Sequence, residues 1–362
     1  MKIALFIVGK YIPSSRFRIL QYIPELEKEG IQCKVFALPI TKFGFTLSFL
    51  PSFIKYLFRR TSQLLVYFPL RYLQIVLGKL DTYDAVFIQK PLSDFPSTAW
   101  LEKQISKRNK NIIFDIDDAV YYTLDGKRKK TDPIPNIAAL AKIIITSNSY
   151  LAEYINNKNK TIILQTTVNR FFVPAGDRNS NDIITIGWTG TKSNYKNLSL
   201  IKNTLLHLSS LYKFKLIIIS DQTKDYLFND CPFAVLIPWN ASSEIDDLQK
   251  FDIGIMPLID NNFNKGKAGF KLIQYMAIGI PSIASPVGIN TTIIKQGIHG
   301  FLASTEEEWF NAFKILLENP QARNKMGKDA RREFETYYSP DKYIHSLKEC
   351  FTFATQHHEA TL

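Results

Sequence analysis

Short runs of apolar, largely β-branched residues recur along the chain, each followed by a stretch with helical periodicity. The runs lie at residues 3–8, 33–38, 85–89, 111–115, 142–146 and 161–164, and then at 183–187, 215–220, 233–237, 252–256 and 281–285. Continuous apolar runs separated by helices are typical of parallel strands that are buried on both faces. Two such series in succession predict an α/β protein with two Rossmann-like, doubly wound domains.

The 362 residues suffice for two domains. The periodic pattern is lost between residues 172 and 182, where Pro, Gly and polar residues cluster. We therefore predict an N-terminal domain over residues 1–172 and a C-terminal domain over 173–338. Residues 339–362 are expected to form a crossover helix, which packs back on the first domain, and a tail.

The positive charge is concentrated in the first half of the chain. Residues 1–180 hold 26 Lys and Arg against 14 Asp and Glu, and residues 181–362 hold 19 of each, so the first half carries the whole net charge of +12. Residues 30–80 contain no acid, and basic side chains alternate with Phe and Tyr over residues 41–80. This pattern predicts an anionic partner: a membrane surface, a phosphorylated substrate or nucleic acid. A core helix with solvated charges is the alternative. The residues expected to meet an acceptor or a membrane are Arg18, Lys55, Arg59 and Arg60.

Basic residues and a glycine follow the first expected strand of the first domain. Arg16 and Arg18 come after the first strand, where doubly wound folds bind ligands, and Gly9 permits a close backbone approach there. Exposed arginines in an ordinary loop are the alternative.

Asp115 ends another expected strand of the first domain, and Asp117 and Asp118 come just after it. Carboxylates at a strand end suggest a magnesium site. The other interpretations are that Asp117 or Asp118 orients an acceptor hydroxyl, as a base if its pKa is raised, or that it caps a helix.

The most informative stretch, residues 266–288, reads GKAGFKLIQYMAIGIPSIASPVG. It predicts a glycine-bearing loop, a helix that begins near Gly269, and a buried strand. The N-terminal end of a helix has unpaired N–H groups and a partial positive charge, which suit a phosphate. Lys267 and Lys271 add charge there, and Gln274 shares a helix face with Lys271. A tight turn and solvated lysines are the alternative.

These residues resemble the donor-sugar signature of the family 4 ("group 1") GT-B glycosyltransferases, which read EGFG…LEAMA-GTPVIAS in this region. Residues 251–258 resemble the strand that leads to the family's donor site, residues 163–174 resemble its linker, and residues 187–190 stand where its second domain opens. The resemblance implies a GT-B fold, whose two Rossmann-like domains face an interdomain cleft. It also implies a retaining, hexosyltransferase-type transfer of sugar without a metal or other cofactor. The implied donor is a nucleotide-diphosphate sugar, and the acceptor is a glycan or a lipid-linked glycan of cell-surface polysaccharide biosynthesis.

The chain departs from this family at two glutamates separated by seven residues, the second of which binds the donor ribose. The corresponding positions here hold Gly266 and Gln274. An amide can still bind ribose hydroxyls, but a carboxylate role at the first position is lost.

A second departure affects the diphosphate, which the family binds with an Arg and a Lys. Trp188 stands at the Arg position, and Lys196 or Lys192 is the best match to the Lys. Arg16 or Lys271 is the candidate for the missing cation. We predict donor binding by Gly9, Arg16, Gly190, Thr191, Lys192, Lys267, Gly269, Phe270 and Gln274, and catalytic roles for Lys196, Lys271, Asp117 and Asp118.

Two other functions stay open: a basic nucleic-acid-binding protein, and a GT-B-like module that binds a nucleotide sugar without turnover. The first has no helix-turn-helix or RNA-stacking signature to support it, so we expect no nucleic-acid partner. The three cysteines are widely spaced, which indicates a reducing compartment. The sequence has no apolar run long enough for a membrane-spanning helix. We expect a cytoplasmic protein that is peripheral on the inner face of a membrane.

Overall fold

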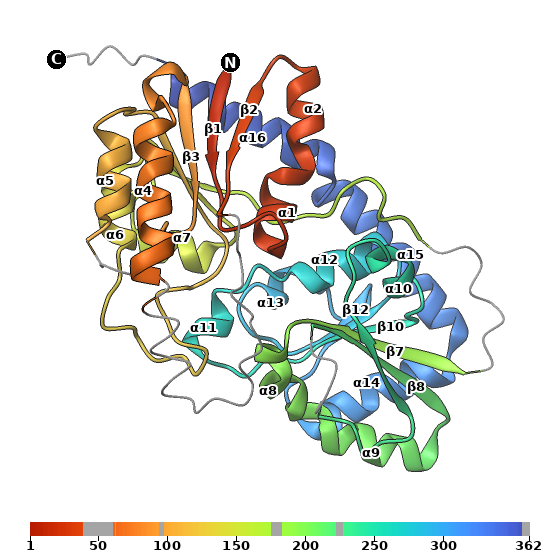
Figure 1. The fold of residues 1–362 in the computed structure, drawn as a ribbon. Helices are drawn as coiled ribbons and strands as arrows, with labels where there is room; N and C mark the ends of the chain where they lie inside the picture. Colours follow the sequence, from red (N-terminus) through yellow and green to blue (C-terminus); the bar gives the residue numbers. More distant parts are fainter. Residues whose placement is uncertain (39–60, 62, 94–97, 175–182, 222–226, 357–362) are drawn as a thin grey trace. The chain divides into compact units, whose positions relative to one another are not determined.

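The computed structural model describes residues 1–362 except 39–60, 62, 94–97, 175–182, 222–226 and 357–362. The chain forms two compact units (Figure 1). The first unit comprises residues 1–123, 128–166 and 343–362, and the second comprises residues 124–127 and 167–342. Each unit has a six-stranded parallel sheet with helices packed on it, so the predicted α/β architecture is confirmed.

The sheet of the first unit has the strand order β2-β1-β3-β4-β5-β6. Its strands are β1 (Lys2–Phe6), β2 (Gln32–Phe36), β3 (Ala85–Gln89), β4 (Ile112–Ile116), β5 (Ile143–Thr146) and β6 (Thr161–Ile163). Its helices are α1 (Pro13–Arg18), α2 (Ile23–Lys28), α4 (Phe68–Leu77), α5 (Trp100–Ser106), α6 (Ile134–Leu140) and α7 (Ser149–Ile155), with short turns η1 (Leu20–Tyr22), η2 (Gln63–Tyr67) and η3 (Leu80–Thr82).

Both faces of this first sheet are buried, because successive strand residues enter different cores. Ala4 and Phe6 belong to the cluster formed with helices α4 to α7. Ile3 and Leu5 belong to a second cluster that includes residues of α2 and of the C-terminal helix α16 (Pro340–Thr355). Burial on both faces explains why the central strands β1, β3, β4 and β5 are largely apolar.

The sheet of the second unit has the order β12-β11-β10-β7-β8-β9. Its strands are β7 (Ile184–Thr189), β8 (Phe214–Ser220), β9 (Ala234–Pro238), β10 (Ile253–Met256), β11 (Ser282–Ala284) and β12 (Gly300–Leu302). The helices are α8 (Tyr195–Leu198), α9 (Lys202–Leu211), α10 (Glu244–Leu248), α11 (Asn262–Lys265), α12 (Phe270–Ala277), α13 (Asn290–Ile293), α14 (Glu306–Glu318) and α15 (Pro320–Tyr337), with short turns η4 (Lys192–Asn194) and η5 (Ser199–Ile201).

The chain leaves the first unit earlier than the sequence predicts. It passes to the second unit between Thr166 and Thr167, not at residue 172, and returns between Lys342 and Tyr343. Residues 167–172 lie with the second unit because Thr167 donates a hydrogen bond to the Tyr338 carbonyl. The Phe172 carbonyl likewise accepts one from Arg331, at 2.9 Å. The cluster of Pro, Gly and polar residues after residue 172 therefore does not mark the change of unit.

Candidate functional site

The strand orders place a binding position in each unit. In the second unit the order reverses between β7 and β10, because the connections from these neighbours run to opposite sides of the sheet. In the first unit the same reversal lies between β1 and β3. Ligands of open α/β sheets bind at the carboxyl ends of the strands that flank such a switch point.

In the second unit, the N-terminal end of α12 lies in the segment that follows β10. Gly269 precedes the helix with a φ of 67°, a left-handed conformation that favours glycine. A Cβ atom at this position would overlap the side chain of Ile293 on α13 and approach Ile289 to 3.0 Å. Both the backbone conformation and the packing therefore require glycine, whether or not a ligand binds at the helix end.

Lys271 on α12 lies beside the turn that follows β7. Its Nζ is 5.5 Å from the ring centroid of Trp188, which is buried near the end of β7. A Cβ atom on Gly190 would lie 2.6 Å from Cη2 of Trp188 and 3.2 Å from Cε of Lys271. The structure thus brings together Gly190, Lys271 and the start of α12, as the donor-site prediction requires.

Lys267 joins the two loops of this site. Its Nζ donates a 3.0 Å hydrogen bond to Asn194 Oδ1, and Asn194 in turn donates to Thr191 Oγ1 at 3.0 Å. The backbone N–H of Lys192 donates to Asp221 Oδ1 at 2.8 Å. Lys267 therefore holds the turn after β7 against the loop before α12, and Thr191 stabilises that turn from within.

The remaining predicted donor residues differ in exposure. Phe270 is half-buried as the first residue of α12, whereas Gln274 is buried further along the same helix. Lys192 and Lys196 are exposed on η4 and α8. The roles of these residues toward ribose and diphosphate stay predictions.

A buried pair of amides that the sequence analysis missed supports this region. Asn197 Oδ1 on α8 accepts hydrogen bonds from Asn264 Nδ2 at 2.9 Å and from the backbone N–H of Ile259 at 3.0 Å. These contacts fasten α8 to the segment that contains α11. Two isolated asparagines in polar stretches carry no signal that distinguishes them from surface residues.

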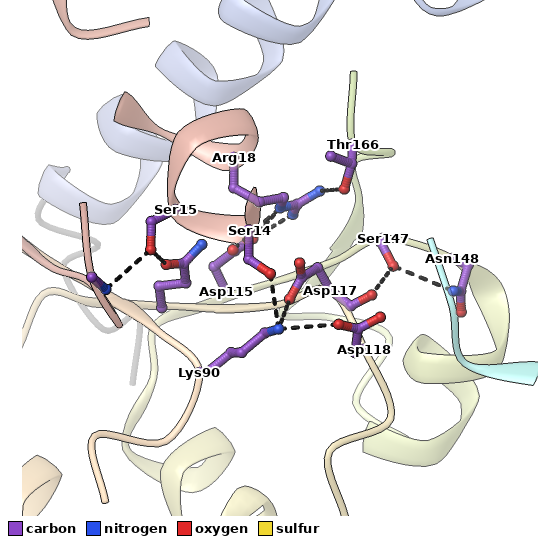
Figure 2. A network of polar contacts seen from close by, with 12 residues as sticks. Ser14, Ser15, Arg18, Lys90, Asp115, Asp117, Asp118, Ser147, Asn148 and Thr166 are labelled. Atoms are coloured by element: carbon purple, nitrogen blue, oxygen red, sulfur yellow. Dashed lines mark hydrogen bonds and ion pairs between the residues drawn. The ribbon is translucent and has the colours of Figure 1, made fainter. Parts of the chain in front are cut away.

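The first unit has a polar cluster at the ends of β3 and β4 (Figure 2). Lys90 follows β3 in a left-handed conformation, with a φ of 57°. Its Nζ lies 2.8 Å from Asp117 Oδ1 and 3.1 Å from Asp118 Oδ2, and it donates to Ser14 Oγ on α1 at 2.9 Å. Ser15, the residue after Ser14, donates a hydrogen bond to Gln89 Oε1 at 2.6 Å. The cluster thus connects the strand ends at the switch point of this unit.

Lys90 contacts both carboxylates, and its charge acts on the pKa of Asp117. Burial acts to raise the pKa of Asp117, but the positive charges of Lys90 and Arg18 outweigh it and hold that pKa below its ordinary value. Asp117 therefore does not have the raised pKa that a general base at this position would need, whereas the role of Asp118 stays a prediction. Lys90 was missed, although it follows a buried strand as directly as the aspartates do. Asp118, whose side chain is 32% exposed, presents a carboxylate to solvent.

Residues 180–319 match the family model described as "Glycosyl transferases group 1". The chain is also similar in structure to a sucrose-phosphate synthase from Thermosynechococcus elongatus, with 14% identity, a TM-score of 0.71, and 97% of this chain and 98% of that chain covered. A glycosyltransferase from Rickettsia africae ESF-5 is similar over 98% of both chains, with 13% identity and a TM-score of 0.68. Anabaena Alr3699/HepE in complex with UDP and glucose is similar over 97% of this chain and 99% of that chain, with 12% identity and a TM-score of 0.65. No curated protein matches the chain.

The resemblance to the GT-B glycosyltransferases is confirmed. The similarity to the solved structures establishes that the chain has a GT-B fold. The residues that match the family model make up most of the second unit. Trp188, Gly190, Gly269 and Lys271 all lie within the matched residues.

For this GT-B chain, the prediction that Arg18 meets an acceptor or a membrane is wrong. The Arg18 side chain is fully buried and forms an ion pair with the carboxylate of Asp115. It also donates to the Leu164 carbonyl at 2.5 Å and to Thr166 Oγ1 at 3.2 Å. Arg18 therefore ties α1 to the sheet and to the segment that follows β6. The carboxylate of Asp115 is paired with Arg18.

Gly9 and Arg16, also predicted for the donor, lie in the segment between β1 and the end of α1. The N–H of Gly9 donates to Ser15 Oγ at 3.4 Å, and the Arg16 guanidinium stacks over the Phe17 ring at 4.8 Å. Their roles toward a ligand stay predictions. Lys55, Arg59 and Arg60 lie outside the described residues. Over the described parts of the chain, no group of three or more His, Cys, Asp or Glu side chains is arranged to hold a metal ion.

Proposed function

We propose that the protein transfers a sugar, with retention of anomeric configuration, from a nucleotide-diphosphate sugar to a glycan or lipid-linked acceptor in cell-surface polysaccharide biosynthesis. The observation that carries the proposal is the arrangement of Lys271, Gly190 and the α12 start at the switch point of the second unit. A helix N-terminus with a neighbouring ammonium group suits a diphosphate, and it stabilises the charge that develops as the diphosphate leaves. A similar fold in Anabaena Alr3699/HepE holds UDP and glucose, which supports a nucleotide-sugar donor.

The test is sugar transfer from radiolabelled UDP-, GDP- and ADP-sugars to lipid-linked acceptors. We expect one donor class to raise the melting temperature of the protein, because a ligand that binds only the folded state stabilises it, and the same class to support product formation. Binding without product would favour the non-catalytic module. Binding of RNA at physiological salt with no response to any nucleotide sugar would favour the nucleic-acid-binding alternative.

The transfer is proposed to proceed without a metal or other cofactor, with the donor phosphate receiving the acceptor proton. In the first unit, Asp117 and Asp118 bind the ammonium group of Lys90, and Asp115 binds Arg18. We therefore expect full activity in excess EDTA, measured as the initial rate of transfer. Loss of activity in EDTA with rescue by Mg²⁺ or Mn²⁺ would contradict the proposal.

We further propose that the first unit docks peripherally on the inner, cytoplasmic face of a membrane, where a lipid-linked acceptor would reside. Helix α4 and the turn before it expose apolar side chains: Leu65, Tyr72, Leu73, Val76 and Leu77. Leu65 and Leu77 are 71% and 72% exposed. The surrounding sequence has no acid over residues 30–80, which favours an anionic lipid surface.

One basic residue of this segment is not available to lipid. Arg71 is buried, and it donates to the Phe36 carbonyl at 2.7 Å and to the Ile7 carbonyl. No helix that the structure describes is long and apolar enough to cross a bilayer. The proposed attachment is thus an apolar helix face assisted by basic side chains, each of which contributes about 1 kcal/mol near an anionic surface.

Liposome co-sedimentation tests the docking. We expect binding to vesicles that contain anionic lipid, weaker binding at high salt, and a loss of about tenfold in bound fraction for Leu73→Ser with Leu77→Ser, since two exposed apolar groups no longer enter the interface. Serine at Lys55, Arg59 and Arg60 should also reduce binding. The matched control is Leu206→Ser with Leu211→Ser, on exposed positions of α9 in the second unit. Equal sedimentation with neutral vesicles, or none with anionic ones, would refute the docking.

A further inference from the structure

The inference concerns Trp188, a bulky aromatic residue at the point where the second unit is expected to hold its donor. Trp188 is 1% exposed and belongs to the core cluster between the sheet and helices α9 and α14. The same indole lies beneath Gly190, and the Lys271 ammonium stands 5.5 Å from its ring centroid. The Trp188 side chain therefore packs in the core and also lies next to two predicted donor residues, Gly190 and Lys271.

We propose that Trp188 is a positioning residue, whose indole holds the Lys271 ammonium at the carboxyl end of β7 so that it binds the diphosphate of the nucleotide sugar. The inference rests on the proposed function and adds to it how the chain supplies a cation at this place. The charge comes from α12, and β7 contributes the aromatic surface that orients it.

The physical reason lies in the lysine side chain. An ammonium group on four methylene carbons is mobile, and ordering it costs conformational entropy when a phosphate binds. Tryptophan provides the strongest cation–π surface among the side chains, and its buried ring is fixed by the core. Gly190 completes the arrangement, because a Cβ atom there would press on the indole and on Cε of Lys271.

A double-mutant cycle on nucleotide binding tests the proposal. The dissociation constants of UDP, GDP and ADP are measured by calorimetry for the wild type, Trp188→Leu, Lys271→Ala and the double variant. For the diphosphate that binds the wild type, we expect losses of about fivefold for Trp188→Leu and about tenfold for Lys271→Ala. The double variant should bind within about twofold of Lys271→Ala, because the tryptophan acts through the lysine.

Melting temperatures separate this role from core packing. Trp188→Leu should lower the melting temperature equally with and without Lys271, because its packing in the core does not depend on the lysine. Trp188→Phe keeps an aromatic face and should retain affinity within about twofold of the wild type.

Multiplicative losses in the double variant, or a Trp188→Phe affinity as low as that of Lys271→Ala, would overturn the positioning role while leaving the proposed function intact. A wild-type protein that binds none of the three diphosphates would overturn the proposed function and this inference with it.

Discussion

Replacement of Asp115 by alanine should lower the free energy of unfolding of the first unit by about 3–5 kcal/mol, because it leaves the fully buried Arg18 guanidinium without its partner. Arg18 also fastens the Leu164 carbonyl and Thr166, so the loss affects the end of β6 as well as α1. Urea unfolding followed by circular dichroism measures the effect. A change below about 1 kcal/mol would contradict this role of the pair.

Two further variants serve as controls for this prediction. Glu29→Ala removes an ion pair with Lys348 in the same unit, whose side chains are 45% and 30% exposed, and should cost less than about 1 kcal/mol. Arg18→Met combined with Asp115→Leu should recover much of the stability lost in Asp115→Ala, because an apolar pair leaves no unpaired buried charge.

Lys271→Ala is expected to lower turnover by well over tenfold, about a hundredfold, because the ammonium group stabilises the diphosphate as it leaves. The initial rate is measured at saturating concentration of the nucleotide sugar that the wild type uses. Lys265→Ala is the matched control: this lysine lies in the same segment, is paired with Asp260 at 3.1 Å, and has a side chain that is 41% exposed. Near wild-type turnover of Lys271→Ala would remove the lysine from the site.

The central strands of both sheets were predictable because they are buried on both faces. Residues such as Ile3 to Phe6 form continuous apolar runs, which local sequence is sufficient to reveal. Strand β12, in contrast, consists of Gly300, Phe301 and Leu302, begins with a glycine and contains no β-branched residue, so it does not stand out as a run. It forms because pairing with β11 supplies partners that only the folded chain provides.

The candidate site was predictable where one short segment contains it, as with Gly269 and Lys271. It was not predictable where the deciding partner is distant in sequence. Arg18 follows a strand end and resembles an anion-binding arginine. In the folded chain it is buried in an ion pair with Asp115, which is 97 residues away in the sequence. Lys90 resembles a surface lysine until Asp117 and Asp118 are brought beside it by the pairing of β3 with β4.

The path of the chain through α16 has a consequence for the order in which the protein is completed during synthesis. Leu347 and Phe351 on this helix pack in the same core cluster as Ile3 and Leu5, which are synthesised before the whole of the second unit. The second unit has all of its own residues by position 342, whereas the first still lacks the helix that covers one face of its sheet. On a ribosome, where N-terminal domains generally fold first, this N-terminal unit is instead the later of the two to finish. Until α16 emerges, an apolar sheet face stays open to chaperones and to aggregation.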